Sequence, residues 1–157
     1  MRALLLTEKG AAPTVGEAPK PTPGPGEARV AVRAAALNHR DVFIQHGQYP
    51  GIEWPVIPGS DGVGVVDAVG EGVDAGLVGQ SVVIDPSLDW GDDPRYQGPD
   101  YTILGMPRPG TFAEHVVVPA ANVVPAPMHL DDAHAAALPL AWLTAWRALV
   151  VRGRVAR

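Results

Sequence analysis

Glycine and proline recur along the whole chain, 18 and 17 times in 157 residues, and they are spread out rather than gathered in one segment. Both residues interrupt regular secondary structure and favour turns. Their spacing therefore predicts many short strands joined by turns, with no long linker. We find no internal repeat and no low-complexity tract.

Five segments are predicted to form strands: Arg2 to Leu6, Ala28 to Leu37, Val63 to Val69, Ser81 to Ile84 and Phe112 to Val118. The second segment alternates, because valine and alanine at 30, 32, 34 and 36 share one face while Arg29 and Arg33 share the other. One face should be buried and the other exposed to solvent. The proline-rich segment 18–26 is expected to be an extended surface connection, since proline cannot donate to a regular ladder.

The predicted helices are few. A short one is expected around Asp41 to His46, and the character changes at Asp131, a good N-cap before an alanine-rich run. A second terminal helix is predicted from Leu140 to Val151, after Pro139. Without a repeating strand–helix–strand rhythm, the pattern favours a mainly β fold, a partly open β-barrel over residues 1–130, followed by a helical connection over residues 131–157.

Length and charge restrict the class of protein. The chain is about one domain long, and its net charge of −5 gives no electrostatic reason to expect a nucleic-acid partner. It has no cysteine, which excludes disulfides and thiolate metal sites. We see no leader and no run of ~20 apolar residues, so we expect no membrane segment and a cytoplasmic location. Four arginines at positions 147, 152, 154 and 157 are expected to be a solvated helix end, with a phosphate or anionic-lipid contact as the alternative.

Several motifs occur in a fixed order along the chain. They are Leu37-Asn38-His39-Arg40-Asp41, Gly47-Gln48-Tyr49-Pro50, the glycine-rich run 58–73 with its continuation 78–83, Gly110 to Glu114, Val118 to Asn122 and Ala135 to Trp146. Together they resemble the medium-chain dehydrogenase/reductase family, which contains zinc alcohol dehydrogenases and quinone oxidoreductases. The resemblance implies a GroES-like catalytic domain. In the family, the last motif leads into a nucleotide-binding domain, which would begin where this sequence stops, so the chain is expected to be a fragment of a longer enzyme.

The resemblance also bears on zinc. Zinc members carry Gly-His-Glu where this chain has Gly59, Ser60 and Asp61, and a Cys ligand where it has Asn38. We therefore expect no zinc. The alternative is an atypical metal site in which His39 and Asp41 join Asp61. Many zinc members also have a four-cysteine lobe, which is replaced here by segment 85–101; that segment must be held by its own aromatic residues and turns.

The resemblance implies site residues for hydride transfer. Tyr49 matches a tyrosine regarded as the proton donor in enoyl reductases, and Asn38, Ser60 and Asp61 are expected near the reacting carbons. His39, Arg40 and Thr144 match or adjoin cofactor-binding positions. For each residue a structural role remains the alternative: a turn tyrosine, an Asn or Thr bonded to local backbone, or a surface His or Arg. Trp54, Trp90 and Trp142 are candidates for an apolar substrate wall or for plain core.

These expectations lead to a ranked set of functions. The first is the catalytic portion of a zinc-independent oxidoreductase that uses NAD(P)H to reduce a carbonyl or quinone, and that is a homo-oligomer when full length. Gly62 and Gly64 are followed by a strand pattern rather than a helix, so they do not form a phosphate loop, and the isolated chain should bind the cofactor weakly or not at all and should not turn over. The alternatives are an alcohol dehydrogenase with an atypical metal site and a GroES-like binding module.

Overall fold

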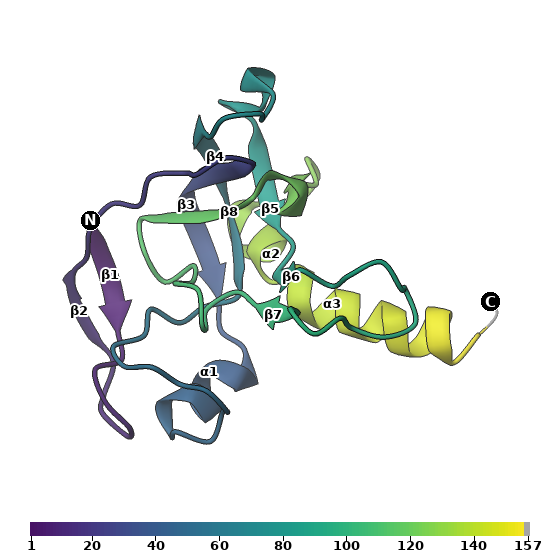
Figure 1. Cartoon of the computed structure of the whole chain (residues 1–157). Helices are drawn as coiled ribbons and strands as arrows, with labels where there is room; N and C mark the ends of the chain where they lie inside the picture. The colour runs from purple at the N-terminus through teal and green to yellow at the C-terminus, as the bar shows by residue number, and fades with distance from the viewer. Residues whose placement is uncertain (156–157) are drawn as a thin grey trace.

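The computed structural model describes residues 1–155, and these are mainly β (Figure 1). The strands are β1 (Arg2–Leu5), β2 (Thr14–Glu17), β3 (Glu27–Ala36), β4 (Asp61–Val69), β5 (Ser81–Ile84), β6 (Ser87–Leu88), β7 (Thr102–Ile103), β8 (His115–Pro119) and β9 (Val123–Pro125). The helices are α1 (His39–Gln45), α2 (Asp132–Ala136) and α3 (Pro139–Trp146), with α3 continuing as a π-helical turn over Arg147–Arg152. Two 3₁₀ turns lie at Ala75–Leu77 and Ala120–Asn122.

One five-stranded antiparallel sheet organises the fold, with strand order β8-β3-β4-β5-β9. The β3–β4 register shifts between Arg29 and Val30 and again between Val32 and Ala34. Such irregularities increase local twist and bend a strand, which helps a sheet to curl on itself. Two small sheets, β1-β2 and β6-β7, complete the barrel, and a bridge between Leu6 and Val56 ties β1 to the segment before β4.

The main core lies inside this curled sheet. Its fully buried side chains include Val30, Val66, Ile84, Leu104 and Val118. Gly64 in β4 lies so close to β3 that a Cβ there would overlap the carbonyl oxygen of Ala31. This glycine therefore serves close strand packing, and the prediction that the run 62–64 is no phosphate loop agrees with its place inside β4.

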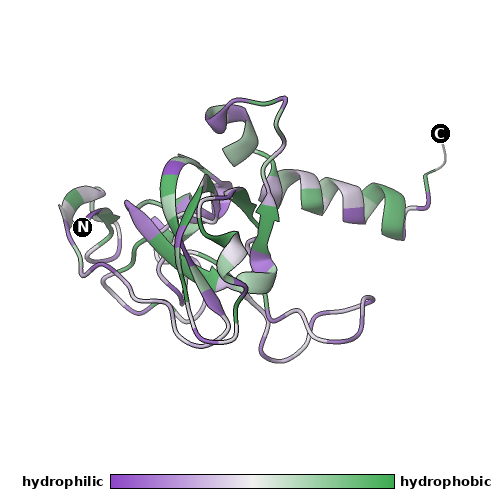
Figure 2. Cartoon of the chain, turned by 90° about the horizontal axis from the view of Figure 1, so that it is seen from above, coloured by the Kyte–Doolittle hydropathy of each residue, from purple (hydrophilic) through white to green (hydrophobic). Residues whose placement is uncertain are grey.

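The C-terminal helices differ in how they pack. Ala135 and Ala136 of α2 are buried against Val63 of β4, with Ala34 of β3 packed beside them. Helix α3, in contrast, extends away from the barrel, as Figures 1 and 2 show from two directions. No helix among residues 1–155 is long and apolar enough to cross a membrane.

Each of the five predicted strands overlaps a strand of the structure. The strands expected at 2–6, 28–37, 63–69 and 81–84 correspond to β1, β3, β4 and β5, whereas the one expected at 112–118 begins only at His115. Strands β2, β6, β7 and β9 were not predicted, because two to four residues carry too little alternation to identify. Segment 18–26 forms no strand, as expected. The boundary at residue 130 stays a prediction.

Candidate functional site

The turn from β3 into α1 buries Asp41 and half-buries Asn38. Asn38 is the N-cap of α1, and its backbone N–H donates to Asp41 Oδ2 at 2.8 Å. The other oxygen, Asp41 Oδ1, accepts from the N–H of Gly59 at 3.1 Å. Burial raises the pKa of Asp41 above its usual range, although these two bonds favour the ionised form. Asp41 therefore fixes α1 against the segment that precedes β4.

Asp61 joins three separate segments. It is 1% exposed; its Oδ2 accepts from Asn38 Nδ2 at 3.0 Å and its Oδ1 accepts from the N–H of Leu140 at 2.9 Å. Its backbone carbonyl accepts from Thr111 Oγ1 at 2.8 Å. Burial raises the pKa of Asp61, and the nearby Asp41 charge acts in the same direction. The side chain thus connects the end of β3, the start of β4 and the start of α3.

Arg40 is buried, with only 8% of its surface exposed. Its Nη1 donates to Ser60 Oγ at 3.0 Å and to the Leu104 carbonyl at 2.9 Å, and its Nη2 donates to the Met106 carbonyl at 3.3 Å. The Ser60 hydroxyl in turn donates to the Leu104 carbonyl at 2.7 Å. The expectation that Arg40 could be a surface residue is therefore wrong; its predicted cofactor contact stays a prediction.

Tyr49 meets this network through Arg40. The guanidinium carbon lies 4.7 Å from the centre of the Tyr49 ring, within the range of a cation–π contact. Tyr49 and Arg40 also line a cavity of about 400 Å³ with Tyr101 and Met106. The predicted proton donor therefore lies at a cavity wall, next to the buried network.

The predicted cofactor residues His39 and Thr144 lie on the surface. His39 packs its ring edge-on against Phe43, with 4.6 Å between ring centres. Thr144, on α3, lines a second cavity of about 350 Å³ with Trp90 and Arg147. The structure thus brings Asn38, Arg40, Ser60 and Asp61 together in one hydrogen-bonded region, whereas the side chains of His39 and Thr144 are exposed.

A metal site would need several of these side chains to converge on one point. Over residues 1–155, no group of three or more His, Cys, Asp or Glu side chains is placed to hold a metal ion. His39 faces outward, and both carboxylate oxygens of Asp41 accept from backbone N–H groups. The trio that the atypical-metal alternative needs, His39, Asp41 and Asp61, is not assembled.

Comparison with known proteins gives the family. The model of the alcohol dehydrogenase GroES-like domain matches residues 24–128. The chain belongs to that family. This confirms the expected GroES-like fold and the resemblance to medium-chain dehydrogenases.

Individual relatives agree with this assignment. Over 126 residues the GroES-like domain is 40% identical to a zinc-type alcohol dehydrogenase-like protein of Schizosaccharomyces pombe, covering 80% of this chain and 36% of that protein. A solved NAD-dependent alcohol dehydrogenase superposes with a TM-score of 0.90 at 45% identity, over 97% of this chain and 47% of the other. A mycobacterial quinone oxidoreductase superposes at 0.76 with 30% identity, over 100% and 43%. The chain spans less than half the length of these relatives.

In this GroES-like domain, segment 85–101 is held without cysteines. Trp90 donates through Nε1 to the Asp93 carbonyl at 3.0 Å and packs edge-to-face on Tyr101, with 5.0 Å between ring centres. Arg147 lies over the Trp90 ring at 4.3 Å and donates at 3.0 Å to the carbonyls of both Pro94 and Arg95. The segment therefore lies beside the C-terminal helix, as Figure 1 shows between β6 and β7.

These contacts correct the interpretation of the C-terminal arginines. Arg147 and Arg152 both donate to the carbonyl of Arg95 rather than forming only a solvated helix end. Arg154 is exposed, and Arg157 lies outside the described residues. The sequence carries no signal for this contact, because Arg147 and Pro94 are 53 positions apart.

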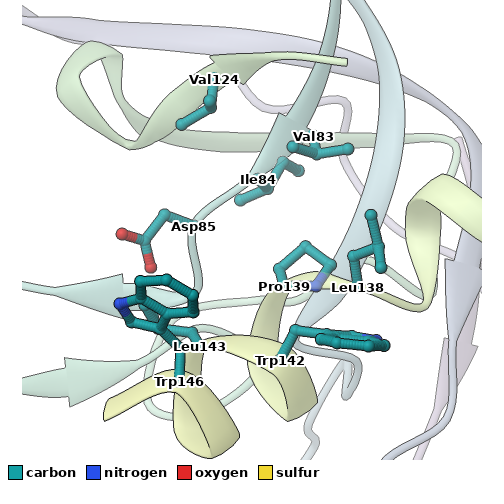
Figure 3. Close-up of a pocket in the computed structure, with 9 residues that line it drawn as sticks. All are labelled: Val83, Ile84, Asp85, Val124, Leu138, Pro139, Trp142, Leu143 and Trp146. Carbon is teal, nitrogen blue, oxygen red and sulfur yellow. The ribbon is translucent and has the colours of Figure 1, made fainter. Parts of the chain in front are cut away.

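The first part of α3 bounds an apolar pocket of about 340 Å³. Its lining residues, shown in Figure 3, are Val83, Ile84, Asp85, Val124, Leu138, Pro139, Trp142, Leu143 and Trp146. Trp142 and Trp146 remain 67% and 61% exposed, so the core alternative for Trp142 is wrong. Trp54, in contrast, packs against the buried cluster of Leu6, Ile44 and Val56, which agrees with a core role.

Proposed function

We propose that this domain is the catalytic portion of a zinc-independent oxidoreductase that uses NAD(P)H to reduce a conjugated carbonyl compound such as a quinone or enone. The observation that carries the proposal is the contact of Arg40 with Ser60, at a position where zinc members of the family have a histidine ligand. The likeness to a mycobacterial quinone oxidoreductase supports the substrate class.

Both the charge and the ligand types of this hydrogen-bonded region disfavour zinc. A catalytic zinc needs three protein ligands, normally His, Cys or carboxylate. The residues present are the amide of Asn38 and the hydroxyl of Ser60, and this hydroxyl is 3.0 Å from the positively charged guanidinium of Arg40. A fixed positive charge at that distance disfavours a divalent cation. These residues therefore do not fit zinc.

Reduction without a metal needs a donor at the substrate oxygen. When bound, NAD(P)H supplies a hydride to the substrate carbon and is itself oxidised. The electron pair displaced from the carbon–oxygen or conjugated double bond collects on oxygen, where Tyr49 donates its phenolic proton. The Asn38 amide, already donating to Asp61 through Nδ2, is oriented by that bond and helps to shape the polar side of the site.

Cofactor binding would need a further domain. Gly62 and Gly64 lie within β4, where they pack against Thr111 and β3 respectively. Among the described residues β4 continues to Val69 after them, so no helix begins there to present backbone N–H groups to a pyrophosphate. We therefore propose that residues 1–157 alone bind NAD(P)H weakly and do not turn over. A cytoplasmic homo-oligomer is the form we propose for the longer enzyme.

Metal analysis tests this proposal on the chain itself. The protein would be produced in zinc-supplemented medium, desalted and measured by plasma mass spectrometry. We expect well under one tenth of a zinc ion per chain, and no saturable NADPH binding by calorimetry. Stoichiometric zinc that resists desalting would overturn the zinc-independent assignment.

A second candidate is an alcohol dehydrogenase with an atypical metal site. It is favoured by the 40% identity to a protein named zinc-type alcohol dehydrogenase-like. The same metal analysis separates the two candidates, because this one requires a tightly bound ion.

A further inference from the structure

Two cavities meet at a single side chain. One is the cavity of about 400 Å³ lined by Tyr49 and Arg40, and the other is the cavity of about 350 Å³ lined by Trp90 and Thr144. Among the described residues, Tyr101 is the only one that lines both. Both volumes lie in the range of ~300–1,000 Å³ that is typical of small-molecule sites. Tyr101 therefore stands between the predicted proton donor and the predicted cofactor contact.

The position of Tyr101 is fixed from several sides. It directly precedes β7, whose two residues pair with β6. Its ring meets the Trp90 ring edge-on at 5.0 Å and an interplanar angle of 77°. Trp90 is in turn covered by Arg147. A ring held in this way presents a defined wall to both cavities.

The two tyrosines present the same chemistry to the first cavity. Tyr49 is held by Arg40 over its ring and Tyr101 by Trp90 against its ring, so neither contact uses the hydroxyl. Each phenol therefore remains available as a donor to a ligand. The rest of the lining includes the apolar Ile103, Met106 and Pro107 and the polar Arg40, Gln97 and Thr102. This combination suits a flat, conjugated molecule that carries carbonyl oxygens.

We infer that Tyr101 is a specificity-determining residue: it forms the wall shared by both cavities and donates a hydrogen bond to a carbonyl of a quinone-class substrate. The inference rests on the proposed function and deepens it by assigning a second recognition residue beside Tyr49. A site that donates a hydrogen bond to its ligand discriminates against analogues that lack the acceptor.

Ligand binding to the chain itself tests this inference without turnover. The probe is 1,4-naphthoquinone, measured by calorimetry, with naphthalene as the analogue without carbonyls. The absence of cysteine means that the quinone cannot form thioether adducts. The variants are Tyr101→Phe, which keeps the ring, Tyr101→Leu, which removes it, and Tyr49→Phe. The control is Tyr96→Phe, an exposed tyrosine of the same segment.

The expected pattern separates the hydroxyl from the ring. Tyr101→Phe should weaken naphthoquinone binding by about three- to tenfold, the value of one hydrogen bond, and leave naphthalene unchanged. Tyr101→Leu should weaken both probes, and Tyr96→Phe neither. Circular dichroism would confirm that each variant is folded; if Tyr101→Leu is not, the Phe variant alone decides.

Two failures are distinguishable. If Tyr49→Phe weakens naphthoquinone binding while both Tyr101 variants bind like the unmodified chain, the role of Tyr101 is refuted and the proposed function stands. If the unmodified chain prefers naphthalene or binds neither probe, the quinone class and the role of Tyr101 fail together.

Discussion

Two regions of the molecule differ in where they place charged and apolar side chains. One is the polar hub, formed by Asn38, Arg40, Asp41, Ser60 and Asp61; the other is the terminal helix, residues 139–152. The hub has its charges inside the protein, where each carboxylate oxygen and both guanidinium Nη atoms have partners; Arg40 Nε is without one. The helix has large apolar side chains outside, such as Trp142, Trp146 and Leu149. Figure 2 shows the helix extending from the body with apolar segments along its length.

The hub stabilises the domain from within, whereas the terminal helix leaves apolar surface exposed for contact with other molecules. Buried polar groups are costly unless they are hydrogen-bonded, and the hub meets that demand almost entirely with its own residues and backbone. Exposed apolar surface of this extent favours association. The two regions meet at Leu140, whose N–H donates to Asp61 at the start of α3.

The largest expected effect on stability comes from replacing Arg40, the cation of the hub. Arg40→Met removes donors to two carbonyls and to Ser60, and leaves these acceptors buried. We expect the free energy of unfolding to fall by about 3 kcal/mol in urea denaturation. Arg33→Met, on the exposed face of β3, is the control and should change it by less than ~0.5 kcal/mol. Equal losses in the two variants would refute the structural role of Arg40.

Two aspartates of β4 should respond to pH in opposite directions. Burial raises the pKa of Asp61, so folding favours its neutral form. The stability that Asp61 contributes to the folded protein is therefore fully present below the ordinary pKa of 3.8 and is lost as the pH rises. Burial also opposes ionisation of Asp67, but Arg29 and Lys20 outweigh it and lower the pKa, so its stabilisation is present above 3.8 and is lost as pH falls.

Matched variants test this contrast. Asp61→Asn should cost roughly 1 kcal/mol near pH 4, because an amide cannot accept from both Asn38 and Leu140, and the cost should shrink toward pH 7. Asp67→Asn should cost more at pH 7 than at pH 3. Urea denaturation across that range measures both, and parallel pH profiles would contradict the assigned environments.

A smaller effect is expected where segment 85–101 meets the terminal helix. Arg147→Met removes the contact over Trp90 and two bonds to carbonyls, and should lower the free energy of unfolding by about 1 kcal/mol. Trypsin should then cut faster after Arg95. Arg154→Met, which changes an exposed arginine, should leave that cleavage rate unaltered. An unchanged rate in both variants would show that Arg147 does not hold the segment.

The smallest effect on stability is expected on the exposed helix. Replacing Trp142 and Trp146 together by Gln should change the free energy of unfolding by less than ~0.5 kcal/mol, because both are mostly exposed. Self-association in sedimentation velocity should decrease. Trp54→Gln, which changes a half-buried side chain packed against Leu6, Ile44 and Val56, should instead be destabilising. If the double variant associates as before, the apolar helix is not the surface that drives association.

Sequence patterns predicted the long elements and part of the hub. Strand β3 was predicted from its alternation and β4 from the strand pattern around Gly62 and Gly64, and Asn38, Ser60 and Asp61 were expected together from the family resemblance. The burial of Arg40 was not, since an arginine beside His39 has the local pattern of a surface residue. Its carbonyl acceptors lie 64 and 66 positions away and its hydroxyl acceptor, Ser60, 20 positions away, and such contacts leave no local signal.

A residue-resolved zinc titration tests the central claim most directly. In ¹⁵N-labelled protein, the side-chain signals of Asn38 Nδ2 and Arg40 Nε report on the hub itself, independently of weak binding at surface histidines. The account predicts that neither signal moves with one equivalent of zinc, because the hub is already hydrogen-bonded and contains a fixed cation. Saturable one-to-one shifts at both positions would contradict it.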